Sequence, residues 1–297
     1  MYMKLLLICC FLTMSICCGA QIDMYQTYRS KAVEYIHLGN FSNALFQLKL
    51  ASPFASDKEQ LELAGIEESI QDSIADVYAR AHMYSDKHKY QLAIIEYQKL
   101  IGMDQKPLKS PLYAYIGQCY EKMKNNDLAK RNYELGALYG ESYSALLLAR
   151  YIRRNNIPVS TEDMISLYLK ADNYYSAMDS LGVEYTRIGN INEAYSWFQK
   201  SNENYSKYKM ASLLLDPETY DKLDNRYKND DPITLLTEAS ASGYTPAQYY
   251  LGLLYYFAEP GDRVQKDCVK GYALLEKASR NGHKKARRIL WQINQNL

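Results

Sequence analysis

Residues that commonly build metal sites, disulfide frameworks or nucleophilic centres are scarce in this chain of 297 residues. It has four histidines, two tryptophans and six cysteines, and four of the cysteines lie within the first 18 residues. The histidines are scattered, and the sequence has no HExxH, CxxC, Gly-rich phosphate loop or Gly-x-Ser-x-Gly elbow. We therefore expect no enzyme activity, with no catalytic residues, no metal and no cofactor.

An excess of either charge is also missing. The chain has 35 Lys and Arg against 34 Asp and Glu, and loss of Lys4 with the leader described next would leave 34 of each. A neutral chain produces no global field that attracts nucleic acid or an anionic membrane surface. We expect no nucleic-acid partner.

The N-terminus has the pattern of a secretory signal peptide. Lys4 precedes an apolar run over residues 5–16, and small residues stand at Cys18 and Ala20. We expect residues 1–20 to be removed by cleavage between Ala20 and Gln21, with export to the periplasm or the extracellular space. The apolar run is shorter than the about 20 residues that cross a bilayer, so we expect no transmembrane segment in the mature chain. A lipid anchor on Cys17 or Cys18 is the alternative, although neither follows a small residue.

A motif of the form [Leu/Ile]-Gly-x-x-Tyr recurs along the chain. Its glycines are Gly117, Gly182 and Gly252, which are 65 and 70 residues apart. Each gap is about twice the roughly 34-residue period of a two-helix repeat, so we expect a weaker copy in each gap. The predicted small residues of the first helices are Ala32, Ala81, Gly117, Ala149, Gly182, Ala211 and Gly252. Those of the second helices are Ala51, Gly136, Ala171, Ser201, Ala239 and Ala278, with Leu100 as a poor match.

These series predict an all-α fold with about seven antiparallel helix pairs. In the last unit, for example, Ala247, Leu251 and Leu254 fall on one helix face. Residues 283–297 have the spacing of a first helix but no partner, which predicts a capping helix. Residues 56–87 are long for one helix, so an extra helix or an extended first helix stands there. Residues 217–232 of the sixth unit, between two prolines, are predicted to form a loop.

Two segments also resemble known repeats. Residues 181–201 resemble a tetratricopeptide repeat, with Ser201 in place of the usual alanine and with signature residues at Leu181, Gly182, Tyr185, Gly189, Ala194 and Phe198. The segment from Ala247 looks like the related Sel-one-like repeat, with its longer loop and with Asp267, Lys270, Lys277 and Ala278. Gly271 stands where that family normally has alanine. The resemblance implies that residues 21–297 form a right-handed α-solenoid that binds other proteins.

Only Cys119 and Cys268 lie outside the leader. Repeats of a solenoid contact only their neighbours, and these cysteines lie four units apart. We therefore predict two unpaired, buried thiols.

Tyrosine is unusually abundant, with 30 residues against six phenylalanines. Many occupy packing positions of the repeats, where the ring packs and the hydroxyl reaches an edge. Positions about one turn before and after the small residue of each first helix should face the inner, concave side. Tyrosine and arginine are enriched at binding hot spots, and they recur there. The predicted partner-binding residues are Tyr78, Gln118, Arg150, Arg153, Arg187, Tyr249 and Tyr256.

Two functions fit these observations. The first is a scaffold, exported by a bacterium, that presents its concave groove to a peptide or to a subunit of an envelope complex. In this hypothesis Arg150 and Arg187 bind an acidic partner segment. The second is a carbohydrate-binding module that uses exposed tyrosines. The scarcity of tryptophan, and the place of Trp197 beside the packing residue Phe198, favour the scaffold.

Overall fold

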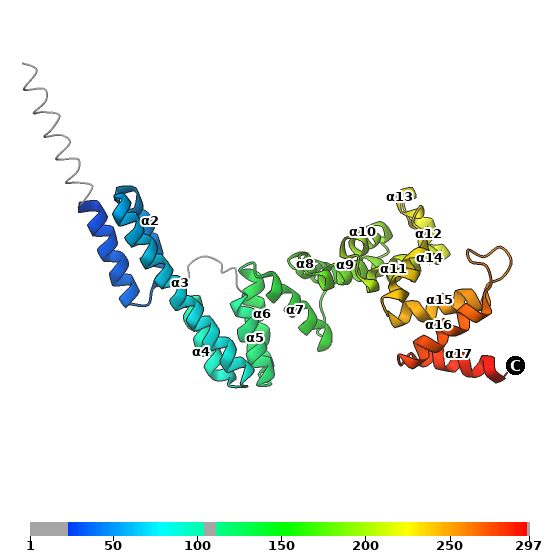
Figure 1. Ribbon diagram of the computed structural model, residues 1–297. Coiled ribbons are helices and arrows are strands. Elements are labelled where there is room, and N and C mark those ends of the chain that lie inside the picture. The colour runs from blue at the N-terminus through cyan, green and yellow to red at the C-terminus, as the bar shows by residue number, and fades with distance from the viewer. Residues whose placement is uncertain (1–22, 104–110, 296–297) are drawn as a thin grey trace, which may run out of the picture. The chain divides into compact units, whose positions relative to one another are not determined.

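The computed structural model describes residues 23–103 and 111–295, and the regular elements in these ranges are helices (Figure 1). The predicted leader, residues 1–20, and the cleavage site between Ala20 and Gln21 lie outside the described residues. Within those ranges, no helix is long and apolar enough to cross a membrane. The chain divides into unit 1, Met1–Leu148, and unit 2, Ala149–Leu297, with the boundary inside one helix.

Unit 1 contains three consecutive helix pairs. Pair one is the helix over residues 23–37 with α2 (Phe41–Ala51), followed by the short helix η1 (Ser52–Phe54). Pair two is α3 (Asp57–Asp86) with α4 (Tyr90–Met103), and pair three is α5 (Leu112–Lys122) with α6 (Asn126–Leu138).

Unit 2 contains the later pairs. Pair four is α7 (Ser142–Arg154), which contains the unit boundary, with α8 (Thr161–Leu169), and pair five is α9 (Tyr175–Arg187) with α10 (Ile191–Ser201). Pair six is α11 (Asn204–Leu215) with α14 (Pro232–Ala241), and α12 (Pro217–Lys222) and α13 (Asn225–Lys228) lie between them. Pair seven is α15 (Thr245–Phe257) with α16 (Cys268–Arg280), and α17 (Lys284–Gln295) ends the described chain. The predicted all-α fold of seven pairs and a final helix is confirmed for the described residues.

The turns of three pairs use the same two-residue device. A residue with positive φ is followed by an asparagine whose side chain accepts a hydrogen bond from the backbone N–H three residues later. In pair five these are Gly189, with φ of 79°, and Asn190, which accepts from the Glu193 N–H at 3.4 Å. Pairs one and three repeat the device at Gly39-Asn40 and Lys124-Asn125. The short turn makes the two helices of each pair antiparallel neighbours.

The predicted register of small residues is confirmed, because every position of both series is buried, including Leu100. A Cβ atom on Gly117 would lie 2.4 Å from the Tyr133 ring, and one on Gly182 would lie 2.5 Å from the Phe198 ring. In pairs three and five, a ring of the second helix therefore packs directly on a glycine of the first.

Pair seven reaches the same closeness by another contact. A Cβ atom on Gly271 would lie 2.6 Å from the backbone nitrogen of Tyr256 and 2.9 Å from the carbonyl oxygen of Gly252. The two helices meet backbone to backbone at this point. This explains why glycine replaces the alanine that the Sel-one-like pattern normally has at position 271.

The region left open by the sequence, residues 56–87, forms the single long helix α3. It begins with a capping box in which Ser56 and Glu59 bond to each other. Its first half packs on pair one through Leu63 and Ile70, and its second half packs within pair two. An extended first helix is therefore the correct alternative.

The predicted loop over residues 217–232 is wrong over most of its length, because α12 occupies its beginning and α13 its middle. The ring of Tyr227 in α13 lies 4.5 Å from that of Tyr195 in α10, and the Tyr195 hydroxyl donates to Asp230 at 2.6 Å. Buried aromatic contacts thus fold this insertion against pair five, which the polar composition of residues 222–231 does not reveal.

Cys119 and Cys268 are both free, as predicted. Cys119 is buried in pair three, whereas Cys268 is exposed, so the prediction of a buried thiol is wrong for Cys268. Its position explains the difference, because Cys268 is the first residue of α16, after the N-cap Asp267 at the end of a surface loop.

Candidate functional site

The seven predicted partner-binding residues fall into separate groups. Tyr78 and Gln118 lie in unit 1, and the other five lie in unit 2. Each group is therefore described within its own unit.

In unit 1 the predicted residues belong to a network of aromatic rings. The Tyr78 hydroxyl donates to the Tyr115 hydroxyl at 3.3 Å, and the Tyr97 ring stacks on that of Tyr115 at 5.4 Å. Gln118 donates from Nε2 to the Tyr143 hydroxyl at 3.0 Å. Burial is the main cause that raises the pKa of Tyr97 far above its usual value. These contacts place Tyr78 and Gln118 in a hydrogen-bonded network of neutral side chains within unit 1.

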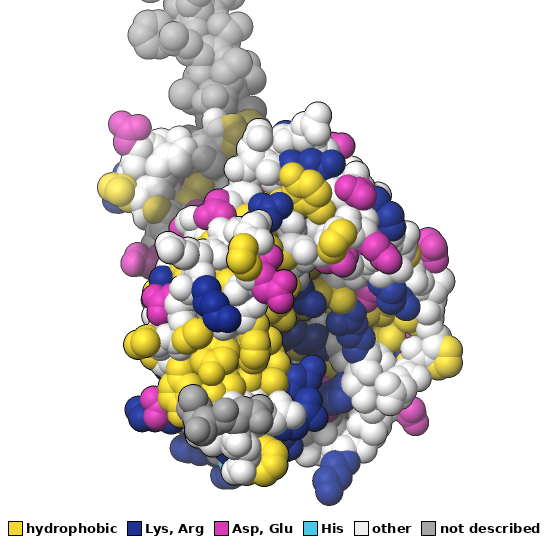
Figure 2. Space-filling view, turned by 90° about the vertical axis from the view of Figure 1, so that its right-hand side faces the viewer, with side chains coloured by type: hydrophobic (Ala, Val, Ile, Leu, Met, Phe, Trp, Pro, Cys, Tyr) yellow, Lys and Arg dark blue, Asp and Glu magenta, His cyan; other side chains and the backbone are white. Residues whose placement is uncertain are grey.

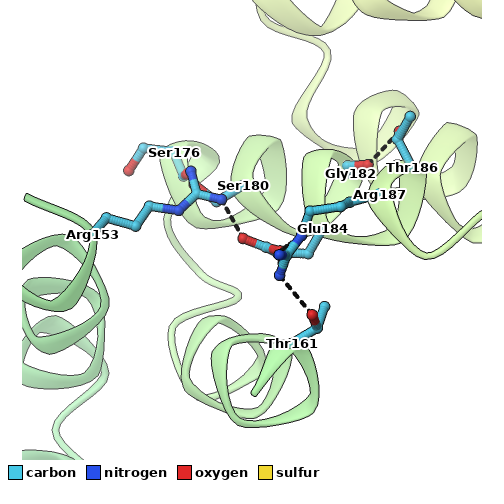
Figure 3. Close-up of polar contacts among 8 residues, drawn as sticks. All are labelled: Arg153, Thr161, Ser176, Ser180, Gly182, Glu184, Thr186 and Arg187. Atoms are coloured by element: carbon cyan, nitrogen blue, oxygen red, sulfur yellow. Dashed lines mark hydrogen bonds and ion pairs between the residues drawn. The ribbon is translucent and has the colours of Figure 1, made fainter. Parts of the chain in front are cut away.

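In unit 2 two of the predicted arginines converge on one acid that the sequence did not single out (Figure 3). Arg153 reaches from α7 to α9 and donates from Nη2 to Glu184 Oε1. Arg187 donates from Nε to Glu184 Oε2 at 3.0 Å, and its Nη2 lies 2.8 Å from the same oxygen. We call Arg153, Glu184 and Arg187 the Glu184 cluster.

Burial differs sharply within the Glu184 cluster. The Glu184 side chain is 2% exposed, whereas those of Arg153 and Arg187 are 45% and 59% exposed. A buried carboxylate is costly unless cations and hydrogen-bond donors satisfy it, so Glu184 requires both arginines. Two cations share one anion, which leaves the cluster with a net positive charge.

Neighbouring polar groups fix the arginine side chains in place. Arg187 also donates from Nη2 to Thr161 Oγ1 at 2.6 Å, and the Arg153 guanidinium lies 5.6 Å from the centre of the Tyr168 ring. Arg150, one turn before Arg153, donates from Nη2 to Ser176 Oγ at 2.9 Å. The hydroxyl is neutral, so the charge of Arg150 is not compensated by this contact.

A hollow of about 240 Å³ lies against Arg153. Its lining residues are Arg153, Ser176, Asp179, Ser180, Val183 and Tyr205. Asp179 accepts hydrogen bonds from Ser201 at 2.7 Å and from Ser206, which engages one of its oxygens in the fold. Burial, followed by the nearby Tyr244 and Asp179, raises the pKa of Tyr205 to about 12, so its hydroxyl remains a donor at neutral pH.

In Figure 2, Lys and Arg side chains gather in a hollow of the visible face, while Asp and Glu lie mostly around its outside. We call the surface formed by Arg150, Arg153, Arg187 and the 240 Å³ hollow the arginine face; α7, α9 and α11 carry it.

The remaining predicted residues, Tyr249 and Tyr256, pack near the end of the described chain. The Tyr249 ring stacks on His283 at 4.3 Å, and the Tyr256 ring lies 4.9 Å from that of Phe257. Both also pack against the apolar cluster that joins α16 to α17. Their contacts serve this terminal packing, and the structure does not join them to the Glu184 cluster.

Glu184 was missed because it is one of the two variable positions of the Leu-Gly-Val-Glu-Tyr motif. A signal was nevertheless present. Glu184 lies three residues before Arg187 on one helix, a spacing at which opposite charges meet, and Arg153 occupies the end of the preceding first helix.

Comparison with known families identifies two segments. Residues 175–206 and 245–283 match the model of the Sel1 repeat. The first covers pair five and the start of α11, and the second covers pair seven and the turn before α17. No curated protein matches this sequence.

Solved structures share the architecture. A Sel1 repeat protein from Oxalobacter formigenes is similar with a TM-score of 0.59 and 19% identity, over 72% of this chain and 86% of that chain. A protective antigen present in uropathogenic Escherichia coli strains, displaying an SLR fold, is similar with a TM-score of 0.60 and 18% identity. That match covers 92% of this chain and 65% of the antigen. The chain therefore has the all-α helical-repeat fold of Sel1-type proteins.

Proposed function

We propose that this protein is a non-catalytic interaction scaffold that binds an acidic segment of another protein on its arginine face. Sel1 repeats generally mediate protein interactions, and two of the pairs match that repeat. The observation that carries the proposal is the Glu184 cluster, which holds two half-exposed arginine side chains, one of which, Arg153, lines an open hollow.

The chemistry of these arginines favours a carboxylate ligand. A guanidinium group has five N–H donors in a planar fork, and the contacts to Glu184 and Thr161 use only part of them. Because Glu184 already holds both side chains, a ligand loses less side-chain entropy on binding than it would with mobile arginines. Arg150 adds a third cation one turn away.

A carbohydrate ligand has less support. Sugar stacking requires exposed rings in a row, but exposed rings such as Tyr139, Tyr175 and Trp291 come from separate elements. Tyr139 also stacks on Tyr113 at 5.4 Å. The rings of unit 1 bond to each other rather than presenting free faces together.

We also propose that the scaffold acts outside the cytoplasm, as a periplasmic or extracellular protein and a possible subunit of an envelope complex. The support is the leader pattern of residues 1–20. N-terminal sequencing of the protein purified from a cell envelope or culture medium should give a chain that starts at Gln21. A chain that retains Met1 would contradict export by cleavage.

The binding test uses a defined probe, a Glu-rich peptide, with a Gln-rich peptide of the same length as its neutral counterpart. The wild-type chain should bind the Glu-rich peptide more tightly, and the difference should shrink as salt is added. Arg150→Glu should weaken binding about tenfold, because it reverses a charge whose only described partner here is Ser176. Arg150 is changed alone because Arg187, the other arginine of the sequence-based hypothesis, also holds Glu184.

Arg280→Glu is the matched control. Arg280 is an exposed arginine of α16 that pairs with Glu276, away from the arginine face. It should bind the Glu-rich peptide as the wild type does. Equal weakening by both variants, or no preference for Glu over Gln, would contradict the proposed function.

A further inference from the structure

A second hollow shares one lining residue, Val183, with the first. Its volume is about 440 Å³, within the roughly 300–1,000 Å³ range of sites that hold small ligands or side chains. Besides Val183, its walls come from Thr186, Phe198, Ser212, Leu213 and Thr219. We call it the α12 pocket.

The polar groups of these walls are already engaged in the fold. The hydroxyl of Thr186 donates to the Gly182 carbonyl at 2.7 Å, and that of Ser212 donates to the Tyr208 carbonyl at 2.8 Å. The Thr219 hydroxyl likewise donates to the Leu213 carbonyl at 2.7 Å. The pocket therefore offers carbon surface, from the side chains of these residues and from Phe198.

Charged groups also line the pocket: Arg187, Lys209 and Asp216. The Asp216 carboxylate accepts from the Thr219 N–H at 3.2 Å and caps α12. Arg187 extends from the Glu184 cluster, so the α12 pocket adjoins the arginine face. An apolar group in the pocket would have cations beside it.

The pocket depends on the insertion of pair six. Asp216 and Thr219 come from the start of α12, which follows α11 after a single residue. Asn192 of α10 holds the end of this insertion, because it donates to the Lys222 carbonyl at 3.2 Å and accepts from the Asp224 N–H at 2.7 Å. A pair with a two-residue turn, such as pair five, has no such wall.

We infer that the α12 pocket binds a bulky apolar side chain of the partner, with acidic residues on both sides of it meeting Arg150, Arg187 and Lys209. This inference rests on the proposed function and specifies the ligand: an acidic segment with a phenylalanine or leucine at its centre. Charge complementarity supports this occupant, since the neighbouring cations would neutralise the flanking carboxylates. Burial of a phenylalanine ring should strengthen binding at least about tenfold over alanine.

The test compares two peptides, Glu-Glu-Phe-Glu-Glu and Glu-Glu-Ala-Glu-Glu, by isothermal titration with the full chain. The wild type should bind the Phe peptide at least about tenfold more tightly. Ser212→Trp places an indole in the pocket and should abolish this advantage while leaving binding of the Ala peptide unchanged. Thr237→Trp, at an exposed position of α14, is the control and should keep the advantage.

Circular dichroism and the thermal midpoint establish that each variant is folded. If Ser212→Trp does not fold, Thr186→Phe is the second variant, and it fills the pocket from α9. Equal binding of the two peptides to the wild type would overturn the pocket inference while the proposed function stands. A Phe advantage that survives both filling variants would overturn the assignment to this pocket. Failure of both peptides to bind would overturn the proposed function and the inference together.

Discussion

Pairs five and seven match the same repeat model, yet they bring their helices together through different atoms. In pair five the Phe198 ring covers Gly182, whereas in pair seven Gly252 and Gly271 let two backbones meet. The shared Leu-Gly-x-x-Tyr motif thus specifies where space is needed, and the second helix determines what fills it.

The two pairs also differ in charge. The positions that carry Glu184 and Arg187 in pair five carry Leu254 and Phe257 in pair seven. Pair seven instead packs Tyr249, Tyr256 and Tyr272 in the apolar cluster that includes α17. The Glu184 cluster is therefore a property of this part of the chain and is not dictated by the repeat motif.

The largest expected effect is that of Gly252→Leu in pair seven. A Cβ atom there would already lie 3.0 Å from Leu275 Cγ and 3.1 Å from the Gly271 carbonyl oxygen. We expect a loss of about 3 kcal/mol in the free energy of unfolding, at the upper end of overpacking costs. Urea denaturation measures this, and an unchanged midpoint would contradict the register of the repeat.

Alanine at the two contacts sharpens the comparison. Gly271→Ala should cost about 2 kcal/mol, because its Cβ would meet backbone atoms that move only if the helices separate. Gly182→Ala should cost less than half of that, since its Cβ would meet the edge of the Phe198 ring, which can tilt, rather than backbone atoms. Unfolding curves of the two variants decide the order; equal losses would mean that ring and backbone contacts are equally rigid.

Glu184→Gln tests a charge that pair five carries and pair seven lacks. The amide keeps one acceptor but loses the ionic part of the contacts with Arg153 and Arg187. We expect a loss of about 1 kcal/mol, because both guanidinium groups remain half exposed to water. Glu276→Gln, which breaks the exposed pair with Arg280, should change stability by less than about 0.5 kcal/mol. Equal effects of the two substitutions would show that the burial of Glu184 carries no energetic weight.

The smallest effect concerns pH at the end of pair seven. Burial, together with Lys285, lowers the pKa of His283, whose Nδ1 accepts the Ala286 N–H at 3.2 Å at the start of α17. The neutral form is favoured in the folded state, so its contribution is complete above the unfolded pKa of about 6.5 and is lost as the pH falls below that value. We expect a loss below about 1 kcal/mol, measured by unfolding at a series of pH values. His283→Asn retains an acceptor without titration and should remove this pH dependence; a slope that persists would assign it to another group.

The sequence was sufficient for the repeat register because glycine and alanine at fixed spacing have one physical reason, the close approach of helices. The sequence was not sufficient to predict features that depend on tertiary contacts. The exposure of Cys268 follows from the length of the loop before α16, and the helix α13 is stabilised by the contact between Tyr227 and Tyr195, which are far apart in the chain.

The arginines of the candidate site were predictable as a group, but their arrangement was not. Arg153 and Arg187 are 34 positions apart, and only the packing of α7 beside α9 brings both to Glu184. Arg150 lies one turn before Arg153 on the same helix, but its hydrogen-bond partner is the neutral hydroxyl of Ser176. Which cation is compensated, and which remains available to a ligand, depends on contacts that no local pattern encodes.

Helix α3 makes the first pair inseparable from the second. Its 30 residues at about 1.5 Å each form a continuous shaft, with Leu63 and Ile70 buried by pair one and Val77 and Ala81 buried within pair two. A shortened chain that began at Asp57 would expose Leu63 and Ile70 to water, and the first half of α3 would lose its packing against pair one. Evolutionary loss or gain of repeats is therefore expected outside residues 23–103, at boundaries where no helix is shared.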